Sequence, residues 1–83
     1  MTKDNIVIYG ADWCDDSQRA KQFMEQHSIQ FDWIDVEANK EAGELVENLN
    51  NGSRTTPTIV FQDGSVLVEP SNIELALKLG VTA

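Results

Sequence analysis

The chain has 83 residues, of which 41% are hydrophobic, and a formal net charge of −8 at pH 7. A chain of this length buries only about 60% of its unfolded surface, so we expect one domain over residues 1–83 and no second core. The negative charge and the absence of a Lys/Arg cluster argue against nucleic acid or an anionic membrane as partner, because both are bound by neutralising phosphates.

The first half of the chain has the pattern strand, helix, strand, helix. Residues 6–9 are a short β-rich run, and apolar residues then recur at helical spacing over residues 20–27. Residues 31–36 are a second β-type segment. Asn39 is the candidate N-cap of a second helix that Gly52 ends. We predict its apolar face to be Ala42, Leu45, Val46 and Leu49.

The second half reads as a hairpin followed by a helix. Residues 58–62 and 65–69 are β-type segments joined by Asp63-Gly64, a pair that favours a type I′ turn. Ser71 and Glu74 form a capping box at the start of the last helix. We predict its apolar face to be Ile73, Ala76, Leu77 and Gly80. The order β-α-β-α-β-β-α predicts an α/β fold with a four-stranded mixed sheet.

Cys14 is the one cysteine of the chain. It lies between the first strand and the first helix, where unpaired N–H groups and the helix dipole favour a thiolate, the form that attacks disulfides. A buried, inert cysteine is the alternative, which the polar neighbours Asp15 and Asp16 disfavour. One cysteine cannot form an internal disulfide, and the four apolar-leaning residues 6–9 are too short a run for a signal peptide. We therefore expect a cytoplasmic protein.

The segment Arg54-Thr55-Thr56-Pro57 precedes the third strand. Proline cannot donate to a sheet ladder, so it is confined to the first residue of a strand or to an edge. A cis Thr56-Pro57 bond would explain its position, although trans is the more frequent form on spacing alone.

Four motifs occur together in this order: W-C-x-x-S at residues 13–17, R-T-T-P at 54–57, D-G at 63–64 and P-S at 70–71. In these motifs the chain resembles the glutaredoxin family of the thioredoxin superfamily, and within it the mycoredoxin-like glutaredoxins. The resemblance implies the thioredoxin/glutaredoxin fold and thiol–disulfide exchange. The expected co-substrate is glutathione or mycothiol, the expected partners are mixed disulfides of proteins with that thiol, and no metal or tightly bound cofactor is expected.

The resemblance also implies roles for single residues. Cys14, beside Trp13, would attack the mixed disulfide. Pro57 would be cis and face Cys14, and the Thr56 backbone would pair with the substrate as an added strand. The thiol-binding residues would be Arg54, Thr55, Thr56, Pro57, Ser71 and Asn72. Arg54 would bind one carboxylate of the thiol, and a plain surface role is the alternative. The N–H groups of Ser71 and Asn72 would bind a second carboxylate. The family usually has Asp where this chain has Asn72.

Near Cys14 the sequence differs from the usual family pattern in two ways. Ser17 stands where most relatives have a second cysteine, which closes the dithiol route and leaves a monothiol mechanism; the sequence is compatible with a natural and with an introduced serine. Asp12, Asp15 and Asp16 place negative charge near the thiol and oppose its ionisation. We therefore predict a Cys14 thiol that is less acidic than in typical glutaredoxins.

Two other classes of function compete with a monothiol oxidoreductase. A thioredoxin-fold module that binds partners without turnover would also retain the fold. An iron–sulfur carrier would bridge a cluster through one cysteine per subunit, but Asp15 and Asp16 would crowd such a cluster. We expect the oxidoreductase, acting as a monomer.

Overall fold

The computed structural model describes residues 6–82. The first five residues, which enter the expectation of no targeting segment, lie outside this range. The elements in chain order are β1 Ile6–Gly10, α1 Asp15–Gln26, β2 Phe31–Asp35, α2 Lys40–Leu49, β3 Thr58–Val60, β4 Val66–Val68 and α3 Asn72–Leu79. This is the predicted order of strands and helices.

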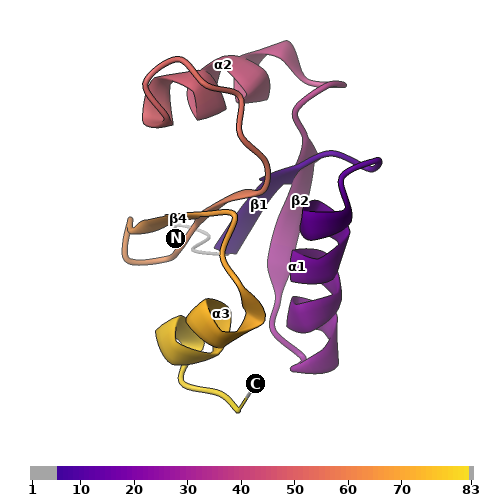
Figure 1. Ribbon diagram of the computed structural model, residues 1–83, viewed down its shortest axis with the longest axis vertical. Helices are drawn as coiled ribbons and strands as arrows, with labels where there is room; N and C mark the ends of the chain where they lie inside the picture. Colours follow the sequence, from indigo (N-terminus) through magenta and orange to yellow (C-terminus); the bar gives the residue numbers. More distant parts are fainter. Residues whose placement is uncertain (1–5, 83) are drawn as a thin grey trace, which may run out of the picture.

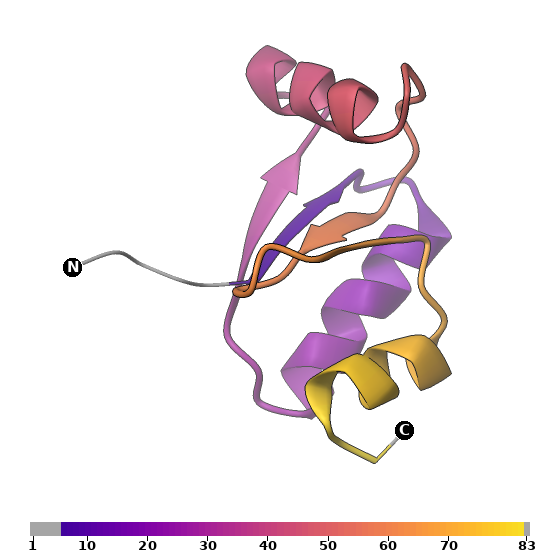
Figure 2. The ribbon, with the colours of Figure 1, turned by 90° about the vertical axis from the view of Figure 1, so that its left-hand side faces the viewer.

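The strands form one four-stranded sheet in the order β2-β1-β3-β4. β1 pairs with β2 in parallel and with β3 antiparallel, and β3 pairs with β4 antiparallel. Helices α1 and α3 cover one face of the sheet, and α2 lies on the other (Figures 1 and 2). The mixed sheet with helices on both faces confirms the predicted α/β fold.

The main core lies between the sheet and helices α1 and α3. Alternate residues of β1, Ile6 and Ile8, point into it because successive side chains of a strand face opposite sides. They pack with buried side chains of the other elements: Ala20, Phe23, Met24, Ile59, Phe61, Leu75 and Ala76.

Helix α2 packs through a second, smaller cluster. Its buried residues are Val36, Ala42 and Val46, against which Tyr9 and Ile34 of the sheet pack. A hollow of about 210 Å³ lies between this helix and the sheet. The Asn39 side chain accepts a hydrogen bond from the Ala42 N–H at 3.0 Å, which confirms the predicted N-cap.

The predicted apolar faces of α2 and α3 are partly wrong. Leu45 and Leu49 of α2 are exposed, and so are Ile73 and Leu77 of α3. In α2 the third buried residue, beside Ala42 and Val46, is Gly43, which the Arg54 side chain covers. In α3 the buried residues are Leu75 and Ala76, because this eight-residue helix meets the core on the side of Leu75.

The hairpin between β3 and β4 also differs from its prediction. The Phe61 N–H donates to the Ser65 carbonyl at 2.8 Å, and the Gly64 N–H donates to the Phe61 carbonyl at 2.9 Å. Three residues therefore form the loop, and only Gly64 among them has a positive φ, of 87°. A type I′ turn needs positive φ at both central residues, so this is a three-residue loop with glycine in the left-handed position.

Candidate functional site

Cys14 is the N-cap residue of α1. Its carbonyl accepts from the Gln18 N–H at 3.0 Å, and its own N–H donates to the Ala11 carbonyl at 3.1 Å. The side chain is half-buried. The predicted position of the thiol at the N-terminus of a helix is confirmed.

The pKa of the Cys14 thiol lies below its ordinary value. Burial is the largest single influence and raises this pKa, since a charged sulfur is less well solvated there. Hydrogen bonds from the Ser17 and Thr56 side chains and from the Ser17 and Asp16 N–H groups lower it, and together they outweigh burial. The site therefore favours the nucleophilic thiolate.

Ser17 is fully buried one helical turn after Cys14. Its Oγ atom accepts a long hydrogen bond from the Ala11 N–H, at 3.4 Å. Gly10 makes room for it, because a Cβ atom at this glycine would lie 3.0 Å from Ser17 Oγ and 2.8 Å from Trp33 Cη2. A hydroxyl in this position supports the thiolate but cannot form a disulfide with it.

The acidic residues near Cys14 do not all face it. Asp16 pairs with Arg19 at 2.8 Å, while Asp12 and Asp15 are exposed. None of the three carboxylates is among the groups that shift the Cys14 pKa. Whether this thiol is less acidic than in other glutaredoxins stays a prediction.

The Thr56-Pro57 peptide bond is cis, as the resemblance implied. The Cys14 Sγ atom lies 3.7 Å from the Thr56 carbonyl oxygen, a distance at which a protonated thiol makes a weak hydrogen bond. The Thr58 hydroxyl donates to the Thr55 carbonyl at 2.8 Å, and Asn50 donates to the same hydroxyl oxygen at 3.1 Å. These contacts hold the backbone of residues 55–57 against the cysteine.

Arg54 turns toward α2. Its Nε and Nη2 atoms lie 3.1 and 3.0 Å from the same Glu47 carboxylate oxygen, Oε2. A Cβ atom at Gly43 would lie 2.8 Å from the Arg54 Cζ atom, so the guanidinium rests on the bare helix backbone there. The predicted carboxylate-binding residue is thus already in contact with a carboxylate of its own chain.

Ser71 caps α3 in the predicted capping box. Its hydroxyl accepts from the Glu74 N–H at 3.1 Å, and its own N–H donates to Glu74 Oε1 at 2.8 Å. Arg19 ties this turn to α1 by donating to the Pro70 carbonyl at 3.0 Å. A role for the Ser71 N–H in holding a substrate carboxylate, together with that of Asn72, stays a prediction, and it would require Glu74 to release this group.

Trp13 precedes the cysteine and is 69% exposed, so it offers an apolar surface beside the sulfur. Within residues 6–82, no group of three or more His, Cys, Asp or Glu side chains is arranged to hold a metal ion. In the same range, no helix combines the length and apolar character needed to cross a membrane.

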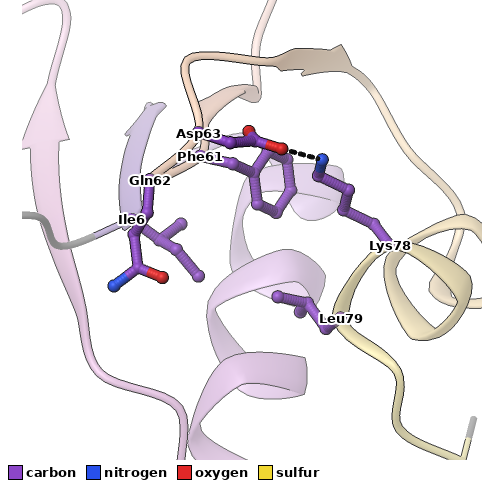
Figure 3. Close-up of a pocket in the computed structure, with 6 residues that line it drawn as sticks. All are labelled: Ile6, Phe61, Gln62, Asp63, Lys78 and Leu79. Atoms are coloured by element: carbon purple, nitrogen blue, oxygen red, sulfur yellow. Dashed lines mark hydrogen bonds and ion pairs between the residues drawn. The ribbon is translucent and has the colours of Figure 1, made fainter.

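A pocket of about 190 Å³ lies at the start of β1 (Figure 3). Cys14 follows the other end of this strand. Figure 3 shows Lys78 reaching Asp63 across Phe61. The two charged groups are 2.8 Å apart, and the ammonium lies 5.3 Å from the ring centre. This pairing joins α3 to the hairpin loop and takes no part in the cysteine site.

Comparison with known proteins identifies the family. Residues 6–66 match the family model described as Glutaredoxin. The chain belongs to the glutaredoxin family. This glutaredoxin is 40% identical over 74 residues to a Mycobacterium tuberculosis protein named "Putative glutaredoxin", covering 89% of this chain and 88% of that one. It is 33% identical over 79 residues to Mycoredoxin 1 of Corynebacterium glutamicum, covering 95% and 98% of the two chains.

Solved structures agree on the fold. A mutant of the thioredoxin-like protein BC3987 superimposes with a TM-score of 0.83 at 22% identity, covering 96% of this chain and all of that one. A glutaredoxin from Archaeoglobus fulgidus gives 0.74 at 19% identity, covering 92% and 86%. The fold is thioredoxin-like, and the family membership makes the chain a thiol–disulfide oxidoreductase of glutaredoxin type.

Sequence reasoning missed the partner of Arg54. In the sequence, Glu37, Glu41, Glu44 and Glu47 together have the pattern of a solvated acidic surface near the second helix, so Glu47 does not stand out among them. Its contact with Arg54, seven residues further along, joins α2 to the loop before β3, and no local pattern distinguishes Glu47 from its neighbours on α2. Gly10 and Gly43 were missed for the same reason, since their close contacts come from other elements.

Proposed function

We propose that this glutaredoxin uses a monothiol mechanism through Cys14 to reduce mixed disulfides between proteins and a low-molecular-weight thiol. The observation that carries the proposal is the pair Cys14 and Ser17: the chain has one cysteine, and the residue one helical turn away is a buried hydroxyl. A hydroxyl cannot resolve a disulfide, so the second thiol must come from solution.

The exchange balances in two steps. The Cys14 thiolate attacks the sulfur of the small thiol in the mixed disulfide, a new S–S bond forms, and the protein thiolate leaves and takes up a proton. A second small thiol, as its thiolate, then attacks the small-thiol sulfur of that bond. This step releases the disulfide of two small thiols and regenerates the Cys14 thiolate.

The chain's own groups support each step. The helix N-terminus and the hydroxyls of Ser17 and Thr56 stabilise the thiolate before attack and when it leaves again. The Thr56 backbone is held beside the sulfur, where it can align an extended substrate. The co-substrate is glutathione or mycothiol, and the names of the relatives favour the second. We also propose that the protein acts as a monomer in the cytoplasm.

Mass spectrometry after exposure to glutathione disulfide tests the mechanism. The expected result is one rapid adduct per chain, reversed by reduced thiol and absent in Cys14→Ala. An alkylating reagent added to a parallel sample reports whether Cys14 is accessible. An accessible Cys14 that forms no adduct would refute the proposal and favour a binding module without turnover.

A further inference from the structure

We infer that Glu47 is a specificity-determining residue, which lowers the affinity of the site for thiols that carry a carboxylate by occupying Arg54. The inference rests on the proposed function, and on the role of Arg54 in binding a carboxylate of the small thiol that the family resemblance implies. It concerns a contact within this chain: two guanidinium nitrogens of Arg54 share one Glu47 oxygen at 3.0 and 3.1 Å.

The geometry leaves Arg54 only part of its binding capacity. A guanidinium binds a carboxylate best through two parallel N–H groups on one edge. Glu47 already takes the edge formed by Nε and Nη2. One face of the guanidinium is covered by the backbone at Gly43, since a Cβ atom there would lie 2.8 Å from Cζ and about equally near both Nη atoms, at 3.0 and 3.1 Å.

An incoming carboxylate therefore competes with Glu47 for the Arg54 guanidinium. It must either displace Glu47 or bind the remaining edge next to a like charge, and both choices weaken its contact. The Arg54 and Glu47 side chains are 42% and 38% exposed. Displacement is thus possible at modest cost, because exposed ion pairs change an equilibrium constant by a factor of only about 1.5 to 5.

A thiol without a carboxylate does not depend on this contact. The Glu47–Arg54 pair would then set a preference for uncharged over anionic co-substrates. The net charge of −8 would favour uncharged co-substrates too, because it repels anions. Arg54 lies two residues before Thr56, whose carbonyl is 3.7 Å from the sulfur, so the pair sits on the segment that reaches the reacting atom.

Binding of S-methylglutathione, which has the carboxylates of glutathione but cannot react, tests the inference without turnover. NMR titration should show that Glu47→Gln binds it about 1.5 to 5 times more tightly than the unchanged chain. Glu44→Gln is the matched control, because it removes the same charge from an exposed position of the same helix. Adding Arg54→Gln to Glu47→Gln should abolish the gain.

Equal affinities of Glu47→Gln and Glu44→Gln would overturn the inference, and so would a gain that survives Arg54→Gln. A turnover assay separates it from the proposed function. Glu47→Gln should lower the KM for a peptide mixed disulfide with glutathione, and leave unchanged that for the same peptide with 2-mercaptoethanol. Tighter binding by Glu47→Gln without turnover of either substrate would refute the proposed function alone, and turnover without a Glu47 effect would refute only the role of Glu47.

Discussion

Replacing Ser17 by alanine isolates the contribution of its hydroxyl to the acidity of Cys14. Ser17 is fully buried, and its side chain is the first of the hydrogen-bond donors that lower the Cys14 pKa. The substitution removes one oxygen atom, and alanine is the better helix former. The backbone N–H groups of Ser17 and Asp16 stay in place, so the change tests one donor of four.

The expected shift follows from the value of a single hydrogen bond. A hydrogen bond to a charged group contributes about 1.5–3 kcal/mol, and one pKa unit corresponds to about 1.36 kcal/mol. Because Cys14 is only half-buried and three other donors remain, we expect the low end, a rise of about one unit. At a pH well below the Cys14 pKa, a rise of one unit lowers the thiolate fraction about tenfold. The greater nucleophilicity of the more basic thiolate then reduces the loss of rate to about three- or fourfold.

The pH dependence of iodoacetamide alkylation, followed by mass spectrometry, measures this pKa. Thr56→Val should shift the pKa in the same direction, since the Thr56 side chain is the second donor. Ser71→Ala, which changes a serine in the cap of α3, serves as the control and should leave it unchanged. An unchanged or lower Cys14 pKa in Ser17→Ala would refute the reasoning that the buried hydroxyl stabilises the thiolate.

Three other predictions concern stability. Gly10→Ala should destabilise the fold by about 1–3 kcal/mol in urea denaturation, because the new Cβ would lie 2.8 Å from Trp33; wild-type stability would contradict this close packing. Ser71→Ala should cost about 1 kcal/mol through loss of the helix cap, seen as a lower Tm, and an unchanged Tm would show that the cap contributes little. Lys78 holds the pKa of Asp63 well below its usual range, so this pair stabilises the fold above the usual pKa of about 3.9 and loses its effect as the pH falls. Asp63→Asn should therefore lower stability most at pH 7, and its deficit should shrink as the pH is lowered from 4 toward 2. A deficit that is the same at pH 7 and at pH 2 would refute the assignment.

Local signals in the sequence predicted much of the fold. The cap at Asn39 and the capping box at Ser71 depend on three or four neighbouring residues, so they can be predicted without knowledge of tertiary contacts. The predicted hairpin is confirmed, but the predicted type I′ turn is wrong. Asp63-Gly64 fits both a two-residue and a three-residue loop, and the pairing of Phe61 with Ser65 selects the second.

The buried faces of short helices were harder to predict. Around α3, two apolar stripes overlap at Ala76: one includes Ile73 and Leu77, the other Leu75. Periodicity shows that a stripe exists, and only the position of the helix on the sheet decides which one is buried. At the site, the family resemblance implied a cis Thr56-Pro57 bond facing Cys14, and the cis bond and the contact of Cys14 Sγ with the Thr56 carbonyl agree with this.

The division of the apolar interior into two clusters has a consequence for how the molecule opens. The apolar cluster between α2 and the sheet contains three buried residues and two partly buried ones, beside a hollow of about 210 Å³, whereas α1 shares the main core with β1, β3 and α3. Local opening costs least where fewest apolar contacts are broken. Amide hydrogens of α2 should thus exchange with solvent sooner than those of α1, and we expect the segment that carries Glu47 to open while the strand that leads to Cys14 stays folded.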